Sequence, residues 1–175
     1  VRAYFEHQNE EVFWLERQIK IHYPCYHADT ELMPVMIQIV KTEKVFQEFD
    51  RELLRSVYYN MVDELFAPLP VTASLFLKER KGDFYCFLCM EDGEEPERQQ
   101  LTEVLETMHS FFEKLLATSI AIYPGEMCRL PQVREQITEL EEWAKNNVCR
   151  EDGIQMTSEA DRNGTPSYSF EAQLG

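Results

Sequence analysis

The segment at 71–90, VTASLFLKERKGDFYCFLCM, constrains the fold more than any other part of the chain. It consists of two apolar runs, Val71–Leu77 and Phe84–Met90, joined by a charged break that ends in Gly82 and Asp83. Runs rich in β-branched and aromatic residues on either side of such a break predict two antiparallel strands joined as a hairpin. Because the second run has no polar position, we expect protein to cover both of its faces.

The composition limits the partners that this chain can have. Its 175 residues suffice for one well-buried domain, and 32 acidic against 17 basic side chains give a formal net charge of -15. Such a surface repels polyphosphate backbones, so we do not expect the chain to bind DNA or RNA by itself.

The chain has no apolar run of about 18 residues and no signal-peptide profile. Five cysteines scattered through apolar runs fit a reducing compartment. We therefore expect a cytoplasmic segment without membrane contact, even if a parent protein is membrane-anchored.

Residues 1–32 predict a helix followed by a loop. Phe5, Val12 and Ile19 recur every seven residues, and glutamates occupy much of the other face. Pro24 ends the helix, because an interior proline loses a hydrogen bond and clashes with the preceding turn. Two interpretations stay open, namely an amphipathic helix packed on its own domain and a coiled-coil seam that forms a weak homodimer.

The rest of the pattern alternates strands and helices. The predicted elements are a strand at 34–40, a helix at 43–66 that Asp50 interrupts or caps again, the hairpin, a helix at 96–117, a strand at 118–123, a helix at 130–147 and a short edge strand at 153–156. This order predicts an α+β fold in which a ferredoxin-like, antiparallel sheet of βαββαβ order is backed by helices.

The hairpin tip Lys81-Gly82-Asp83-Phe84, set within this order and followed by TSIAIYPG, resembles the GGDEF, or diguanylate-cyclase-like, domain. With LLRSVYYNMVDEL and the terminal SYSFEAQLG, the chain is similar to the degenerate GGDEF-like central segment of AraC-type transcription regulators. The resemblance implies a nucleotide-cyclase-like fold for residues 33–157. It also implies a linker at 158–175 toward a helix-turn-helix domain outside this chain, and we expect the preceding helix and loop at 1–32 to serve signalling or dimerisation.

The departures from the active pattern bear on catalysis. Active cyclases of the resembling family hold two divalent cations with carboxylates on the first strand and at the hairpin tip. The first strand here has Gln38 and Val40 instead of aspartates, and the tip keeps Asp83 but lacks the doubled glycine and the glutamate. Lys81 places a bulky cation where backbone would have to approach phosphate. One carboxylate cannot assemble a two-metal site, so we expect neither catalysis nor a cofactor.

Two other groups of metal-ligating residues are better explained as structure. Cys86 and Cys89 would face opposite sides of a strand about 10 Å apart, too far for a disulfide or a shared metal. His22, Cys25 and His27 lie near a proline bend without a further ligand pair of suitable spacing. We expect core thiols in the first group and a surface loop in the second.

The sequence thus predicts a non-catalytic signalling or dimerisation module that relays an upstream signal to a DNA-binding domain outside this chain. One alternative is a sensing domain that binds a nucleotide or another small molecule in the degenerate cleft between the first strand and the hairpin. The other alternative is an active nucleotide cyclase, which the loss of carboxylates disfavours. The expected partners are a second copy of the chain, and DNA only through the other domain.

Overall fold

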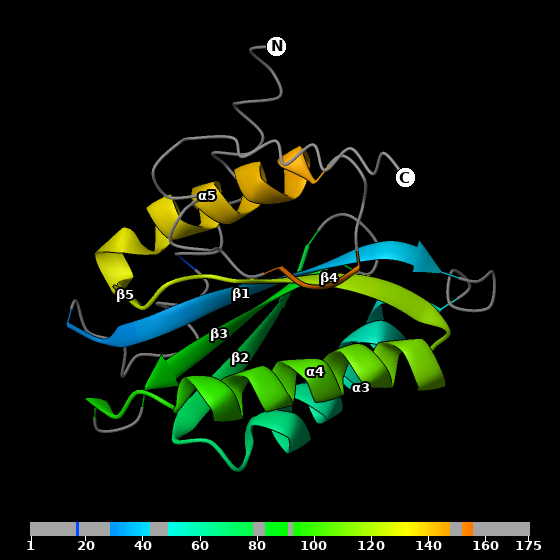
Figure 1. Ribbon diagram of the computed structural model, residues 1–175, viewed down its shortest axis with the longest axis horizontal. Coiled ribbons are helices and arrows are strands. Elements are labelled where there is room, and N and C mark those ends of the chain that lie inside the picture. The colour runs from blue at the N-terminus through cyan, green and yellow to red at the C-terminus, as the bar shows by residue number, and fades with distance from the viewer. Residues whose placement is uncertain are drawn as a thin grey trace, which may run out of the picture.

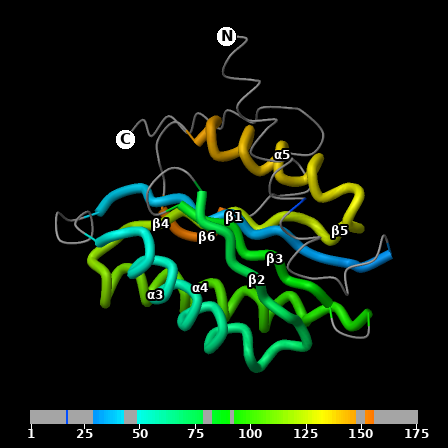
Figure 2. Tube along the Cα trace, turned by 180° about the vertical axis from the view of Figure 1, so that it is seen from behind, coloured from blue at the N-terminus to red at the C-terminus, as the bar shows by residue number. Residues whose placement is uncertain are grey.

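The computed structural model describes residues 17, 29–42, 49–78, 83–90, 93–147 and 152–155. In this part, the chain has an α+β fold with one mixed sheet of six strands and three α-helices. The helices are α3 (Arg51–Phe66), α4 (Arg98–Leu115) and α5 (Val133–Asn146). Figure 1 shows α3 and α4 together on one side of the sheet and α5 alone on the other, and the same layers appear from behind in Figure 2.

The sheet has the strand order β2-β3-β1-β4-β6, and β5 pairs with the start of β1. The strands are β1 (Glu31–Thr42), β2 (Val71–Leu77), β3 (Phe84–Met90), β4 (Thr118–Pro124), β5 (Cys128–Arg129) and β6 (Gly153–Ile154). All pairs are antiparallel except β4 with β6, which are parallel. The predicted antiparallel pairing therefore holds for all the described pairs except the one at this edge, where α5 returns the chain across the sheet before β6 begins, as a parallel pairing requires.

β1 is the central strand and is longer than the segment 34–40 that the sequence predicted. It pairs with β3 along one edge and with β4 and β5 along the other. Leu32, Met33 and Lys41 belong to this strand, although Pro34 and the polar residues after Val40 resembled strand boundaries. Pairing along both edges supplies the hydrogen bonds that extend β1 beyond its apolar run.

Pro34 occupies a central strand without interrupting a ladder. Its carbonyl accepts a hydrogen bond from the Gly125 N–H at 2.7 Å. The N–H that proline lacks would lie on the same side of β1, next to the residues that connect β4 to β5, so its absence costs no ladder hydrogen bond. A Cβ on Gly125 would lie 2.7 Å from the Pro34 carbonyl oxygen. The close approach of these two backbones therefore requires glycine at this position.

α3 begins at a side-chain cap, and each of the three helices ends within two residues of its predicted position. The Asp50 carboxylate accepts the Leu53 N–H at 2.7 Å and caps α3, which confirms that Asp50 starts a helix. α4 is two residues shorter at each end than predicted, and a 3₁₀ turn, Leu130–Gln132, precedes α5. The predicted seam residues Phe5, Val12 and Ile19 and the predicted linker at 158–175 lie outside the described residues.

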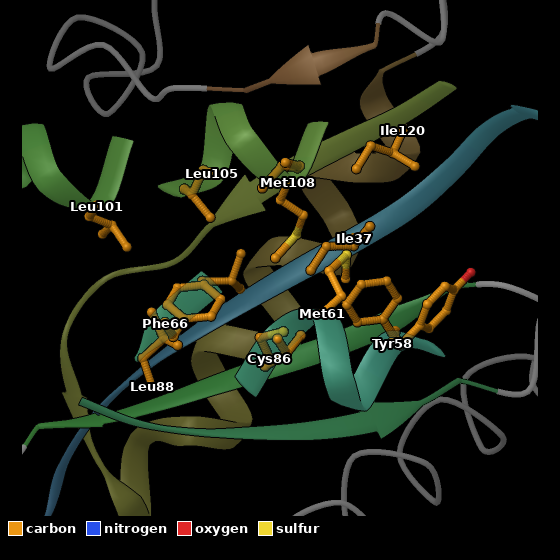
Figure 3. Packing of buried hydrophobic residues seen from close by; sticks show 14 of the residues in the cluster. Ile37, Tyr58, Met61, Phe66, Cys86, Leu88, Leu101, Leu105, Met108 and Ile120 are labelled. Carbon is orange, nitrogen blue, oxygen red and sulfur yellow. The ribbon is translucent and has the colours of Figure 1, made fainter. Parts of the chain in front are cut away.

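β3 is covered on both faces, as predicted. Phe84, Cys86, Leu88 and Met90 belong to the cluster beneath α3 and α4, where Figure 3 shows Cys86 and Leu88 among Ile37 of β1, Met61 and Phe66 of α3 and Leu105 of α4. Tyr85 and Phe87 belong to the second cluster, beneath α5, and Cys89 packs against it. Cys86 and Cys89 thus face opposite sides of the sheet, which is also as predicted.

No helix in the described part of the chain is both long enough and apolar enough to span a membrane.

Replacing Phe87 or Leu88 with Asp is expected to prevent folding. Both side chains are fully buried, one in each core, and an unpaired buried charge costs several kcal/mol against a total stability of about 5–15 kcal/mol. Thermal unfolding followed by circular dichroism checks this result. Thr72→Asp, at an exposed position of the neighbouring strand, is the matched control and should melt close to the parent chain. A native melting curve for Phe87→Asp or Leu88→Asp would contradict the two-sided burial of β3.

Candidate functional site

The hairpin tip lies beside the end of β1, where the resemblance implies that a nucleotide site would be. Phe84 pairs with Ile37, and Asp83 directly precedes it. Gln38 and Val40 follow Ile37 on β1, so four of the six sequence-predicted positions are brought into one corner of the sheet. Lys81 and Gly82 lie outside the described residues.

Asp83 forms part of the sheet. Its side chain is 3% exposed, and Oδ1 accepts the backbone N–H of Ile39 at 2.8 Å. Its backbone carbonyl accepts the N–H of Lys78 at 2.9 Å and closes the hairpin. The β1–β3 register ends at Ile37 and Phe84, so the carboxylate takes the place of the next backbone acceptor for β1. The one acid retained at the tip is therefore engaged by the backbone of the neighbouring strand.

Aromatic rings pack against this corner from the helical side. The Tyr58 ring of α3 lies 4.5 Å from the Phe84 ring and 5.4 Å from the Phe112 ring of α4, measured between centroids. Burial raises the pKa of the Tyr58 phenol well above its usual value, and the nearby charge of Asp83 raises it further. At neutral pH this phenol is protonated and is not a general base.

Gln38 and Val40 are tied to the other face of the sheet, beneath α5. Gln38 Oε1 accepts a long hydrogen bond of 3.4 Å from the Tyr123 hydroxyl, which in turn accepts one of 2.8 Å from Asn147 Nδ2 at the end of α5. Trp143 packs edge-on against the Tyr123 ring. Val40 lies at a bulge, where the β1–β4 register shifts, and packs against the core beneath α5. Neither side chain offers a carboxylate oxygen to a cation.

A second polar cluster joins the hairpin to α5 and was missed by the sequence analysis. Lys78 Nζ and the Tyr85 hydroxyl both donate to Glu141 Oε1 of α5. The Lys78 ammonium also lies 5.1 Å from the centroid of the Tyr85 ring and 3.9 Å from Met36 Sδ. The side chains of Lys78 and Glu141 are only 11% and 17% exposed, so removing either one would leave the other as a largely buried charge without its partner.

The signals for this cluster were weak but present in the sequence. Tyr85 stands in an otherwise apolar run, and a buried phenol usually finds a hydrogen-bond partner. Glu141 directly follows Leu140 on the apolar side of its helix, where an acid also requires a partner. Neither signal indicates which residue the partner is.

The described residues of the types that bind metals do not lie together as a ligand set. Within the described part of the chain, no group of three or more His, Cys, Asp or Glu side chains is arranged to hold a metal ion. Burial raises the pKa of the Cys128 thiol to about 11 and that of Cys86 further, so both stay protonated at neutral pH. His109 Nε2 lies 3.5 Å from Asp152 Oδ2, where α4 meets the start of β6. His22, Cys25 and His27 lie outside the described residues.

In comparisons with known proteins, no protein-family model, no curated protein and no solved structure matches this chain. Its function is therefore inferred from the contacts of its own side chains. These contacts link the hairpin tip to β1 through Asp83 and to α5 through Lys78.

Removing the Asp83 carboxylate is expected to destabilise the domain. Asp83→Ala leaves the Ile39 N–H buried without its acceptor, which costs about 1–3 kcal/mol of unfolding free energy, whereas Asp83→Asn keeps an acceptor oxygen and should lose less. Urea unfolding measures both losses. Asp63→Ala, at an exposed position of α3, should change stability by less than about 0.5 kcal/mol. Equal stabilities for the Asp83 and Asp63 alanine variants would mean that Asp83 is not a structural acceptor.

Proposed function

We propose that this chain is a non-catalytic regulatory module, a degenerate GGDEF-like domain that relays a signal to a DNA-binding domain outside the chain, as in AraC-type transcription regulators. The observation that carries this proposal is the buried hydrogen bond from the Ile39 N–H to the Asp83 carboxylate. It gives the retained acid of the hairpin tip a structural role.

The contacts at the corner argue against phosphoryl chemistry. A two-metal site needs several hard oxygen ligands that are free to bind cations and to neutralise a triphosphate. A cation that bound Asp83 would compete with the Ile39 N–H for a carboxylate that is nearly inaccessible to solvent. Gln38 and Val40 contribute an amide that is bonded to Tyr123 and an aliphatic side chain that packs in the core. This set of ligands fits neither metal recruitment nor nucleotide cyclisation.

The topology supports the nucleotide-cyclase-like component of the proposal. The strands β2, β3, β1 and β4 lie side by side in this order, with α3 and α4 on one face. The chain order of these elements is strand, helix, two strands, helix and strand, which is the order of a ferredoxin-like βαββαβ unit. In this interpretation β5, α5 and β6 are additions to the βαββαβ unit, and the unit and its additions together make up the proposed domain of residues 33–157.

The contacts of α5 support a relay. Two polar links attach it to the sheet, from Glu141 to Lys78 and Tyr85 of the hairpin and from Asn147 to Tyr123 of β4. α5 is also the last helix before the C-terminal residues in the described part of the chain. A change at the hairpin tip would therefore alter contacts of the helix that leads toward a downstream domain. The net charge of -15 disfavours contact between this chain and DNA, so the proposal assigns DNA binding to that other domain.

Magnesium is expected not to strengthen GTP binding. Isothermal titration of the chain with GTP should give the same heats with and without magnesium, because the described residues of the corner offer no group of carboxylates arranged to hold a cation. Incubation with GTP and magnesium or manganese, followed by mass spectrometry, should yield no cyclic dinucleotide. Magnesium-dependent binding at micromolar concentration that Asp83→Ala abolishes would favour the cyclase, and magnesium-independent binding would favour the sensing domain.

The relay requires that a change in the hairpin is felt in α5. Lys78→Met removes the cation that faces Glu141 but keeps a side chain of similar length, so hydrogen exchange in α5 should accelerate. Lys114→Met, at an exposed position of α4, makes the same change of charge and is the matched control. Mass spectrometry of peptides from α5 and β4 measures the exchange. If α5 exchanges at the same rate in both variants, the hairpin and α5 are not coupled and the relay is refuted.

A further inference from the structure

β6 is a short strand that few hydrogen bonds hold on the sheet. Its two residues pair in parallel with Ala121 and Ile122 of β4, and the N–H of Gln155, which follows β6, donates to the Ile122 carbonyl at 2.8 Å. Figure 2 shows β6 beside β4, at the outer end of the strand order. Because so short a strand has little bonding of its own, one further contact has a large effect on how often it detaches.

A side-chain contact joins the start of β6 to α4. Asp152 directly precedes β6, and its Oδ2 lies 3.5 Å from Nε2 of His109 on α4. The backbone carbonyl of Asp152 also accepts a hydrogen bond of 3.3 Å from the Gln155 side-chain amide. Asp152 is therefore tied to the residue whose N–H bonds to β4, and its carboxylate links this short segment to the neighbouring helix.

The His109 imidazole is incompletely satisfied at this contact. Its Nε2 is inaccessible to solvent and has no hydrogen-bond partner in the described part of the chain, although 23% of the side chain is exposed. The Asp152 oxygen at 3.5 Å is close enough for an ion pair but too far for a good hydrogen bond. In a protonated imidazole both ring nitrogens are donors, so protonation makes Nε2 a charged donor beside a carboxylate.

In the described part of the chain, the charged groups on this flank of α4 are acids. Glu106 and Glu113 lie three residues before and four residues after His109, which places them on the same side of the helix. β4 has no charged residue from Thr118 to Pro124, and β6 has none after Asp152. α3 packs toward β2, on the side of α4 away from β6, so its charged residues do not face this contact. The surroundings therefore favour a positive charge on the imidazole.

We propose that His109 and Asp152 form a pH-sensitive contact, the β6 latch, that fastens the start of β6 to α4. In acid the imidazolium donates to the Asp152 carboxylate, and the charges of Glu106 and Glu113 stabilise it. As the pH rises through the range in which histidines ordinarily lose their proton, about 5 to 8, the ion pair becomes a contact between a neutral ring and a carboxylate. β6 then has fewer interactions with the domain and detaches more often.

The direction of the pH effect follows from proton linkage. The charged imidazole has a carboxylate partner while β6 is docked and loses this partner when β6 detaches, so the docked state binds the proton more tightly. The latch is therefore complete at the acidic end of the range and is lost as the pH rises. Carboxylates ordinarily stay ionised above about pH 5, so the acids on this flank keep their charge throughout.

The position of β6 in the chain gives the latch a consequence. β6 is the last strand of the described part and precedes the predicted linker at 158–175, so its docking fixes where the chain leaves the sheet. The consequence for a downstream domain rests on the proposed function, but the latch itself does not. It involves neither Asp83 nor the link from Lys78 to α5, so its failure would leave the proposed function intact.

Hydrogen exchange at Gln155 tests the latch, because its N–H bonds to the Ile122 carbonyl only while β6 is docked. NMR measures the protection factor, the intrinsic exchange rate divided by the observed rate, at about pH 5.5 and at about pH 8. The parent chain should be protected about threefold better at the lower pH. His109→Gln and Asp152→Asn each remove one member of the pair and should abolish this difference. Asp63→Asn, which removes an exposed carboxylate of α3, is the matched control and should keep it.

A double variant shows whether the two residues act as one pair. A chain with both His109→Gln and Asp152→Asn should have the same protection at Gln155 at about pH 5.5 as either single variant, because each change removes the whole contact. Native thermal melting of every variant is verified first. Protection in the parent chain that does not depend on pH, single variants that keep the parent's dependence, or losses that add in the double variant would overturn the proposal.

Discussion

The structure depends on supplying hydrogen-bond partners to the backbone of β1, the strand buried at the centre of the sheet. β1 has a neighbour along both edges and a hydrophobic core on each face, so water cannot replace a missing partner. Each irregularity of β1 has a local solution. Pro34 lacks an N–H on the side next to the residues that connect β4 to β5, where no ladder bond is needed. The Asp83 carboxylate accepts the N–H of Ile39 just beyond the end of the β3 ladder.

This requirement bears directly on function. A nucleotide cyclase needs carboxylates that are free to bind cations, whereas the Asp83 carboxylate completes a sheet. Gln38 and Val40 have likewise become part of the contacts beneath α5. A corner that supports the sheet in this way can still transmit a displacement, because its residues contact β1 and, through Lys78, α5. The proposed regulatory role thus follows from the same contacts that oppose catalysis.

The two edges of the sheet differ in what they offer to partners. On one side, β6 is a two-residue strand, which leaves little backbone for another chain. On the other side, β2 is a seven-residue strand without a charged residue, and Leu69 and Arg51 bond to its outer backbone groups at the two ends.

The sequence alone determined the hairpin, the cores of the three described helices and the two-sided burial of β3, because apolar spacing, breaks and caps such as Asp50 are local signals. It left open what each polar residue would contact. Asp83 meets Ile39 across 44 residues and Lys78 meets Glu141 across 63, and no local pattern encodes such a separation. The full length of β1, the parallel pairing of β6 and the two-residue β5 also arise only when distant strands supply hydrogen bonds. Only the tertiary structure therefore decided that the one acid at the hairpin tip supports the sheet, because burial beside β1 gives its carboxylate a backbone N–H to accept.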